Sequence, residues 1–184
     1  MKLIVAVTGA SGITYAIGFL EAAKKNEIET HLIITDSAKK VANHEIGDIT
    51  QLTSLASKVY TPEEMSAGIA SGSYPVDGMV IVPSSMKTIA ALAHGFADNL
   101  VTRAADVQLK EKRPLIVVPR ETPLHAVHLE NMAKLSHLGA VILPAMPGFY
   151  HNPEKIEDLV DFISGKILDQ LGVENQLYCR WGSG

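Results

Sequence analysis

A chain of 184 residues is the size of one domain, and its 47% hydrophobic and 20% charged residues exclude an intrinsically disordered protein. Sixteen basic and twenty acidic residues give a formal net charge of −4, which excludes the basic surface of a nucleic-acid-binding protein. The single cysteine, Cys179, excludes an internal disulfide framework and a cysteine-zinc cluster, and it indicates a reducing compartment, the cytoplasm. No run reaches the roughly 18 apolar residues of a membrane span, so we expect neither export nor membrane insertion.

Short apolar runs rich in β-branched residues recur along the chain, and each is followed by a helical pattern. The runs are Lys2–Thr8, Thr30–Thr35, Gly78–Val82, Leu115–Val118 and Val141–Leu143. Continuous apolar runs of this length are typical of strands buried on both faces, and their alternation with helices indicates a parallel sheet. The sequence therefore predicts a single α/β domain over residues 1–184, a doubly wound, Rossmann-like parallel sheet with helices on both faces.

Two other segments carry a structural prediction. Apolar residues recur at helical spacing from Ile156 to Leu171, which predicts a long amphipathic helix. Asn152 is expected as its N-cap and Pro153 as its first residue, where a missing N–H costs nothing. Residues 47–73 are rich in Ser, Thr, Gly and Ala and weak in pattern, and we interpret them as irregular or insertion-like.

Ligands of such sheets bind outside the carboxyl ends of the strands, so the segments after the apolar runs are the candidates for chemistry. Thr8–Gly12 follows the first run and leads into a helical pattern near Ile13. Its small residues permit a phosphate or another anion to approach backbone N–H groups at a helix N-terminus, and a tight turn without a ligand is the alternative. Gly9 and Gly12 lack the spacing of the dinucleotide-binding fingerprint.

Hydroxyl-rich segments follow the second and third runs. Thr35–Ser37 offers an N-cap, and Glu45, about two turns further on, is either a solvated helix residue or part of the active edge. Pro83–Thr88 is a second hydroxyl-rich entry to a helix, suited to a phosphate or to polar ring atoms. Two such loops in one sheet favour a ligand more than one does.

The fourth and fifth runs are followed by charged and aromatic residues. Arg120 and Glu121 place a guanidinium, suited to bidentate phosphate recognition, next to a carboxylate that can act as acid or base. A surface ion pair between them is the alternative. Pro144–Tyr150 is a turn with aromatic groups, in which Tyr150 either donates to an anion or seals the core.

Two other patterns do not support a site. His125 and His128, with Glu130 nearby, lack the spacing of a zinc-binding helix and an evident third ligand, so we expect no metal. Ser11 lacks the surrounding pattern of a hydrolase nucleophile elbow, so we do not interpret it as the nucleophile of a hydrolase.

A set of ordered motifs spans nearly the whole chain. They are Thr8–Gly12, Pro83–Thr88, Asn99–Lys110, Val118–Glu121, His128–Met132, Pro147–Tyr150 and Arg180–Gly182. In this combination the sequence closely resembles the UbiX-type flavin prenyltransferases, including the small partner subunits associated with hydroxyarylic acid decarboxylases.

The resemblance implies an enzyme that binds reduced FMN and alkylates it with dimethylallyl phosphate, adding a fourth ring through flavin N5 and C6 without a metal. The product implied by the family is prenylated FMN, which serves a separate UbiD-type decarboxylase. The family also implies a homo-oligomer, a homododecamer, with FMN bound where subunits meet.

The resemblance further implies roles for individual residues. Flavin contacts map onto Gly9, Ala10, Ser11, Thr35, Ser85, Met86, Lys87, Thr88 and Arg120. The prenyl phosphate maps onto Lys110, Arg120, Tyr150 and Lys166. The reacting centre is surrounded by Ser11, Glu45 and Glu121, with Glu121 as the proton-transfer partner.

Elementary chemistry fits these roles, because negative charge grows on a departing phosphate and fixed cations stabilise it most in the transition state. Three features depart from the family pattern. Ser84 stands where many relatives have cysteine, Lys166 stands where arginine is expected, and residues 47–73 match poorly. Lysine keeps the charge of arginine and loses its bidentate fork, so the affinity for the prenyl phosphate is expected to differ.

Two other functions remain as alternatives. The first is a non-catalytic FMN-binding accessory subunit of an aromatic acid decarboxylase, against which Lys110, Glu121 and Tyr150 argue, because an FMN carrier needs no second phosphate site. The second is a nicotinamide-dependent short-chain reductase, suggested only by Thr8–Gly12. This sequence lacks the Tyr-x-x-x-Lys pair that is typical of those reductases.

Overall fold

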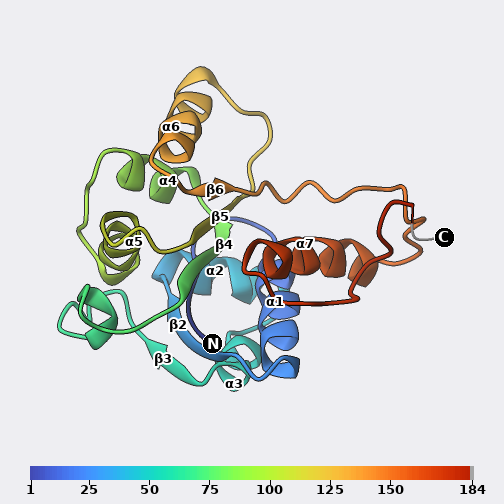
Figure 1. The fold of residues 1–184 in the computed structure, drawn as a ribbon, viewed down its shortest axis with the longest axis horizontal. Helices are drawn as coiled ribbons and strands as arrows, with labels where there is room; N and C mark the ends of the chain where they lie inside the picture. The colour runs from blue at the N-terminus through green and yellow to red at the C-terminus, as the bar shows by residue number, and fades with distance from the viewer. Residues whose placement is uncertain (183–184) are drawn as a thin grey trace.

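A computed structural model describes residues 1–182, so Ser183 and Gly184 of the expected domain lie outside the described residues. The centre of the fold is a six-stranded parallel sheet in the order β3-β2-β1-β4-β5-β6 (Figure 1). Its strands are β1 (Lys2–Val7), β2 (Glu29–Ile34), β3 (Lys58–Tyr60), β4 (Gly78–Ser84), β5 (Leu115–Pro119) and β6 (Val141–Ile142). All five predicted strands are confirmed.

Helices cover both faces of the sheet, as predicted (Figure 1). One face is covered by α1 (Ile13–Lys25), α2 (Asp36–Glu45), α3 (Thr50–Leu55) and α7 (Ile156–Gln170). The other is covered by a 3-10 turn, η1 (Gly68–Ala70), and by α4 (Met86–Ala93), α5 (Leu100–Lys110) and α6 (Ala126–His137). No helix within residues 1–182 combines the length and apolar character needed to cross a bilayer.

The continuous apolar runs follow from this layering, because successive side chains of a strand point to opposite faces. In β1, Leu3, Val5 and Val7 pack against α1 and its neighbours, whereas Ile4 and Ala6 pack against the helices of the other face. All five side chains are fully buried. The sheet therefore separates two hydrophobic cores, each with its own set of helices.

The strand order reverses between β1 and β4. From β1 the chain builds outward through β2 to β3, and it then crosses back to build β4, β5 and β6 on the other side. Crevices in open α/β sheets form where the order reverses, outside the carboxyl ends of the strands. The loops that follow β1 and β4 therefore flank the expected ligand position.

The interpretation of residues 47–73 as irregular is wrong, because they contain α3, β3 and η1. The strand β3 is only three residues long, lies at the sheet edge and buries only Tyr60, so no apolar run marks it. A buried hydrogen bond of 2.9 Å between the Tyr60 hydroxyl and Nδ1 of His31 in β2 joins it to the sheet.

We expect Tyr60→Phe to lower the free energy of unfolding by about 1 to 3 kcal/mol, because it leaves the buried His31 nitrogen without its partner. Urea unfolding measures the change. Tyr15→Phe is the matched control, since the Tyr15 hydroxyl has no hydrogen-bond partner within residues 1–182. Equal stability of the two variants would mean that the hydrogen bond between Tyr60 and His31 does not stabilise the fold.

The predicted start of the last helix is also wrong. Helix α7 begins at Ile156, and Lys155 is its extended N-cap residue. Asn152 lies earlier, with a positive φ of 53°, so neither it nor Pro153 belongs to the helix. The Asp158 carboxylate accepts the backbone N–H groups of Glu154 at 2.9 Å and Lys155 at 3.2 Å. These hydrogen bonds fix the helix start at Ile156, three residues after the proline that was expected to begin the helix.

Candidate active site at the carboxyl edge

The loops after β1 and β4 are tied together at the point where the strand order reverses. The Thr8 hydroxyl donates to the Pro83 carbonyl at 3.0 Å and accepts the backbone N–H of Ser85 at 2.8 Å. Ser85 is the N-cap of α4, and its hydroxyl accepts the N–H of Thr88 at 3.4 Å. Two of the predicted loops are therefore held side by side.

Two glycines shape the first loop. A Cβ atom on Gly9 would lie 2.4 Å from Cβ of Ser37, so only glycine permits the start of α2 to approach so closely. Gly12 has a φ of +103°, a left-handed conformation that turns the chain into α1. Thr35 caps α2 by accepting the N–H of Ala38 at 3.2 Å, as its sequence position predicted.

The N-terminus of α1 is occupied by a carboxylate of the chain itself. Glu45, the last residue of α2, accepts the backbone N–H of Gly12 at 3.0 Å and of Ile13 at 2.8 Å. Ala10 donates its own N–H to the Thr8 carbonyl. A ligand anion was expected at this helix end, but in the structure the N–H groups of Gly12 and Ile13 are already bound by Glu45 and are not available to a ligand.

The surroundings of Glu45 keep it ionised. Its partial burial favours the neutral acid, but hydrogen bonds from the Ser11 side chain and from the N–H groups of Gly12 and Ile13, together with the charge of Arg120, favour the carboxylate more. The net effect lowers the pKa of Glu45 below its ordinary value. Glu45 is therefore a negative group that orients the loop around Ser11.

We expect Glu45→Gln to destabilise the protein at pH 7 by removing this interaction with the helix end. Because the folded-state pKa is lowered, the stabilisation is fully present above the ordinary value of 4.5 and is lost as pH falls through the lowered value. Urea unfolding from pH 7 downward should show the gap between wild type and variant closing. A constant gap, or the same behaviour in the control Glu21→Gln on the surface of α1, would contradict this account.

Arg120 brings the end of β5 to the same loop. Its Nε donates to the Ser11 carbonyl at 3.1 Å, and its backbone N–H donates to the Ser84 carbonyl at 3.3 Å. The alternative of an ion pair between Arg120 and Glu121 is not what forms, since Glu121 instead accepts the backbone N–H of Thr122 at 3.1 Å. The edge therefore combines a cation, two carboxylates and the hydroxyls of two helix caps.

The remaining residues predicted to contact the flavin lie in the first turn of α4. Met86, Lys87 and Thr88 follow the Ser85 cap, and the Lys87 ammonium lies 3.9 Å from the Asp98 carboxylate. Backbone N–H groups in the first turn of a helix point outward without helical partners, which suits a phosphate. Ser84 lies fully buried beneath this turn, and its hydroxyl has no hydrogen-bond partner within residues 1–182.

Lys110 does not join this edge in a single chain. It ends α5, pairs with Glu111 and lies against Gly72, in the chain that precedes β4. The helix runs back from the carboxyl edge to the amino edge of the sheet, where β5 begins at Leu115. The five residues of β5, about 16 Å of extended chain, separate the two edges.

Tyr150 and Lys166 lie in a third place, among the aromatic residues of α7 and of the tail, by which we mean residues 173–182. The Tyr150 ring makes edge contacts with Phe162 at 6.0 Å and Trp181 at 5.4 Å between centroids. Lys166 Nζ lies 5.9 Å from the centroid of the Tyr178 ring. Figure 1 shows the connection from β6 to α7 and the tail extending together beyond the sheet.

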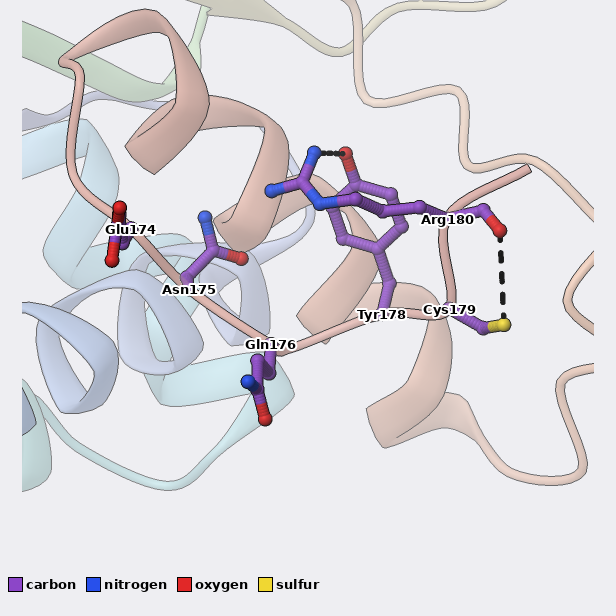
Figure 2. A pocket seen from close by; sticks show the side chains of 6 residues that line it. All are labelled: Glu174, Asn175, Gln176, Tyr178, Cys179 and Arg180. Atoms are coloured by element: carbon purple, nitrogen blue, oxygen red, sulfur yellow. Dashed lines mark hydrogen bonds between the residues drawn. The ribbon is translucent and has the colours of Figure 1, made fainter. Parts of the chain in front are cut away.

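A hollow of about 750 Å³ runs along the tail, and it was not predicted from the sequence. Figure 2 shows the residues that line it: Glu174, Asn175, Gln176, Tyr178, Cys179 and Arg180. Only the Arg180–Gly182 motif pointed to this segment. Elsewhere, the ring centroids of His125 and His128 lie 3.5 Å apart with the ring planes tilted by 30°. Residues 1–182 hold no group of three or more His, Cys, Asp or Glu side chains that could bind a metal ion.

Comparisons with known proteins address the chain as a whole. The sequence profile of the family described as Flavoprotein matches residues 1–168. The Flavin prenyltransferase UbiX of Methanothermobacter thermautotrophicus is 51% identical over 97% of this chain and 94% of that protein. The Flavin prenyltransferase LpdB of Lactiplantibacillus plantarum is 49% identical over 98% and 97%.

Solved structures agree over the full length. A dodecameric FMN-dependent UbiX-like decarboxylase from Escherichia coli O157:H7 superposes with a TM-score of 0.96, at 43% identity and with full coverage of both chains. AnUbiX, in complex with FMN and dimethylallyl pyrophosphate, superposes equally well at 41% identity, covering 100% of this chain and 98% of that one.

Proposed function

This chain belongs to the UbiX-type flavin prenyltransferase family of flavoproteins, and we propose that it transfers the dimethylallyl group of dimethylallyl phosphate to N5 and C6 of reduced FMN. The observation that carries the proposal is the position of Arg120. It brings a guanidinium to the loop around Ser11, at the point where the strand order reverses and beside the cap of α4. The complex of AnUbiX with FMN and dimethylallyl pyrophosphate supports a site for FMN together with a dimethylallyl donor.

The carboxyl edge suits FMN. The first turn of α4 provides backbone donors for a phosphate, and Arg120 provides a cation beside them. We assign flavin binding to Gly9, Ala10, Ser11, Thr35, Ser85, Met86, Lys87, Thr88 and Arg120. Bound reduced FMN supplies the electron-rich N5 and C6 atoms that are alkylated.

The prenyl phosphate requires cations on its leaving group, for which we assign Lys110, Arg120 and Lys166, with the Tyr150 hydroxyl as a donor. These groups lie in three separate places of one chain, so a single copy does not assemble the subsite. We therefore propose a homo-oligomer, a dodecamer like that of the E. coli neighbour, in which neighbouring copies bring Lys110, Tyr150 and Lys166 to the Arg120 edge. Fixed side-chain cations then stabilise the departing phosphate without a metal.

Alkylation of N5 releases its proton to the departing phosphate. Closing the new ring then joins flavin C6 to the prenyl alkene, so the other alkene carbon gains a proton, returned by the phosphate, and C6 loses one. We assign acceptance of the C6 proton to the Glu121 carboxylate, with the released phosphate as a second acceptor. Glu121 is exposed at the carboxyl edge and hydrogen-bonded only to its neighbouring N–H within residues 1–182. Glu45, held ionised at the α1 terminus, keeps the Ser11 hydroxyl in place beside the reacting atoms.

The product is a modified flavin, and its use belongs to another protein. We propose that a UbiD-type decarboxylase receives the prenylated FMN in the cytoplasm. The lone Cys179 supports a reducing compartment.

The test of this function is the flavin dependence of phosphate release. Purified protein under anaerobic conditions should release inorganic phosphate from dimethylallyl phosphate when reduced FMN is present. It should release none with oxidised FMN. Release that is independent of the flavin indicates a phosphatase and would overturn the proposal, and no release from either the phosphate or the diphosphate would favour an accessory FMN carrier.

A further inference from the structure

One carboxylate near the end of α7 gathers the polar side chains of the tail. Asp169 accepts the Tyr178 hydroxyl at 2.6 Å and the Asn175 amide at 2.9 Å. Both terminal nitrogens of Arg180 also donate to it, at 2.8 and 3.2 Å. The Asp169 side chain is only 17% exposed, so these partners replace most of its water.

At neutral pH the ionisation states of Asp169 and Tyr178 suit the hydrogen bond between them. Partial burial opposes the charge of Asp169, but the bonds from Arg180, Tyr178 and Asn175 outweigh it and lower the pKa of that carboxyl. Burial, and then the neighbouring Asp169, raise the pKa of the Tyr178 hydroxyl to about 12. The carboxylate therefore remains an acceptor and the phenol remains a donor.

The tail that Asp169 holds contacts two residues assigned to the prenyl phosphate: Lys166 in α7 and Tyr150 in the loop before α7. Tyr178 carries the ring over which Lys166 lies, and Trp181 packs edge-on against Tyr150 at 5.4 Å. Phe162 lies between the two groups, 4.9 Å from Tyr178 and 6.0 Å from Tyr150. The surroundings of Tyr150 and Lys166 therefore depend on where the tail lies.

Two cations, Arg180 and Lys166, lie beside Tyr178, and only Arg180 is in an ion pair within residues 1–182. The guanidinium of Arg180 is paired with Asp169. It lies over the Tyr178 ring, as Figure 2 shows. Lys166 forms no ion pair within residues 1–182, and its ammonium lies over the ring of Tyr178. Asp169 thus neutralises the structural cation and leaves the charge of Lys166 for a phosphate.

We propose that Asp169 is a positioning residue for donor binding: by holding Tyr178 and Arg180 it fixes the tail in the place that presents Tyr150 and Lys166 to the prenyl phosphate. This role rests on the proposed prenyl transfer. Without the carboxylate, the tail occupies its bound position in only a fraction of molecules, and the apparent donor affinity falls by that fraction. At saturating donor the tail is again in place, so the rate of the chemical step is retained.

The test is steady-state prenylation by the Asp169→Asn variant, in which the amide keeps an acceptor for Tyr178 and loses the charge that holds Arg180. We expect the KM for dimethylallyl phosphate to rise about tenfold, with kcat changed less than about twofold. The Kd for FMN should not change, because the assigned flavin contacts lie at the carboxyl edge. Asp161→Asn, the same substitution on the same helix outside this network, should behave as wild type.

Two further measurements separate positioning from general damage. Trp181 is the only tryptophan, so its fluorescence anisotropy reports the tail directly and should fall in Asp169→Asn. The double variant Asp169→Asn with Arg180→Gln should raise KM no further than Asp169→Asn alone, because both changes break one contact.

An unchanged KM in Asp169→Asn, or additive effects in the double variant, would overturn the positioning role while leaving prenyl transfer intact. A loss of kcat and FMN binding together would mean that the substitution damages the fold, which also contradicts the proposal. A wild-type protein that fails to prenylate FMN would overturn the proposed function itself, and the donor-binding role of Asp169 with it.

Discussion

Replacing Glu121 by glutamine should lower the rate of flavin prenylation by at least about 100-fold, the usual contribution of a general base. Glutamine has nearly the same shape and still accepts the N–H of Thr122, so the loop after β5 should keep its conformation. It has no carboxylate to take the proton from flavin C6. Activity at the remaining level would come from proton transfer to the released phosphate.

The measurement is the rate of prenylated FMN formation in anaerobic single-turnover reactions, together with the Kd for FMN. FMN affinity should stay at the wild-type level, because no predicted flavin contact is removed. Glu130→Gln, which removes the same charge from helix α6, serves as the control and should be fully active. A Glu121→Gln variant with wild-type turnover would remove this residue from the reaction.

Mixing two inactive variants should restore activity if the prenyl-phosphate subsite is shared between copies. Lys110→Ala and Arg120→Ala should each lose most activity, because each removes a cation from the leaving phosphate. Lys110 lies at the amino edge of its own chain and Arg120 at the carboxyl edge. In randomly reassembled oligomers, about a quarter of the sites then receive Lys110 from one variant and Arg120 from the other, so about a quarter of wild-type activity returns.

The matched control mixes Arg120→Ala with Ser11→Ala. These residues are joined within one chain, where Arg120 donates to the Ser11 carbonyl, so every site in the mixture carries one of the two defects. That mixture should remain inactive after the same unfolding and reassembly. Rescue in both mixtures, or in neither, would contradict a subsite built from more than one copy.

Much of the fold followed from local patterns in the sequence. The five apolar runs predicted five strands because two-sided burial forces continuous apolar residues, as Leu3 to Val7 show. Thr35 and Ser85 were recognisable as helix entries because capping depends on neighbours three residues away. The strand β3 was missed because only Tyr60 of its three residues is buried.

The candidate site was less predictable, because its contacts join distant segments. Glu45 reaches Gly12 across 33 positions, and nothing near Glu45 in the sequence distinguishes it from a solvated helix residue. Lys110 is the last residue of a family motif, but it lies at the amino edge of the sheet of its own chain, away from Arg120. Only the path of α5 in the structure reveals this position. The Asp169 network depends on the tail folding back over α7, for which the sequence offers no periodic signal.

The most direct test of prenyl transfer is the mass of the flavin after anaerobic incubation of the purified protein with reduced FMN and dimethylallyl phosphate. We expect a gain in mass equal to one C5 prenyl unit, and its absence in the Glu121→Gln reaction over the same time. Tight binding of FMN with an unchanged flavin mass, for the diphosphate as well as the phosphate, would contradict prenyl transfer and leave an FMN carrier.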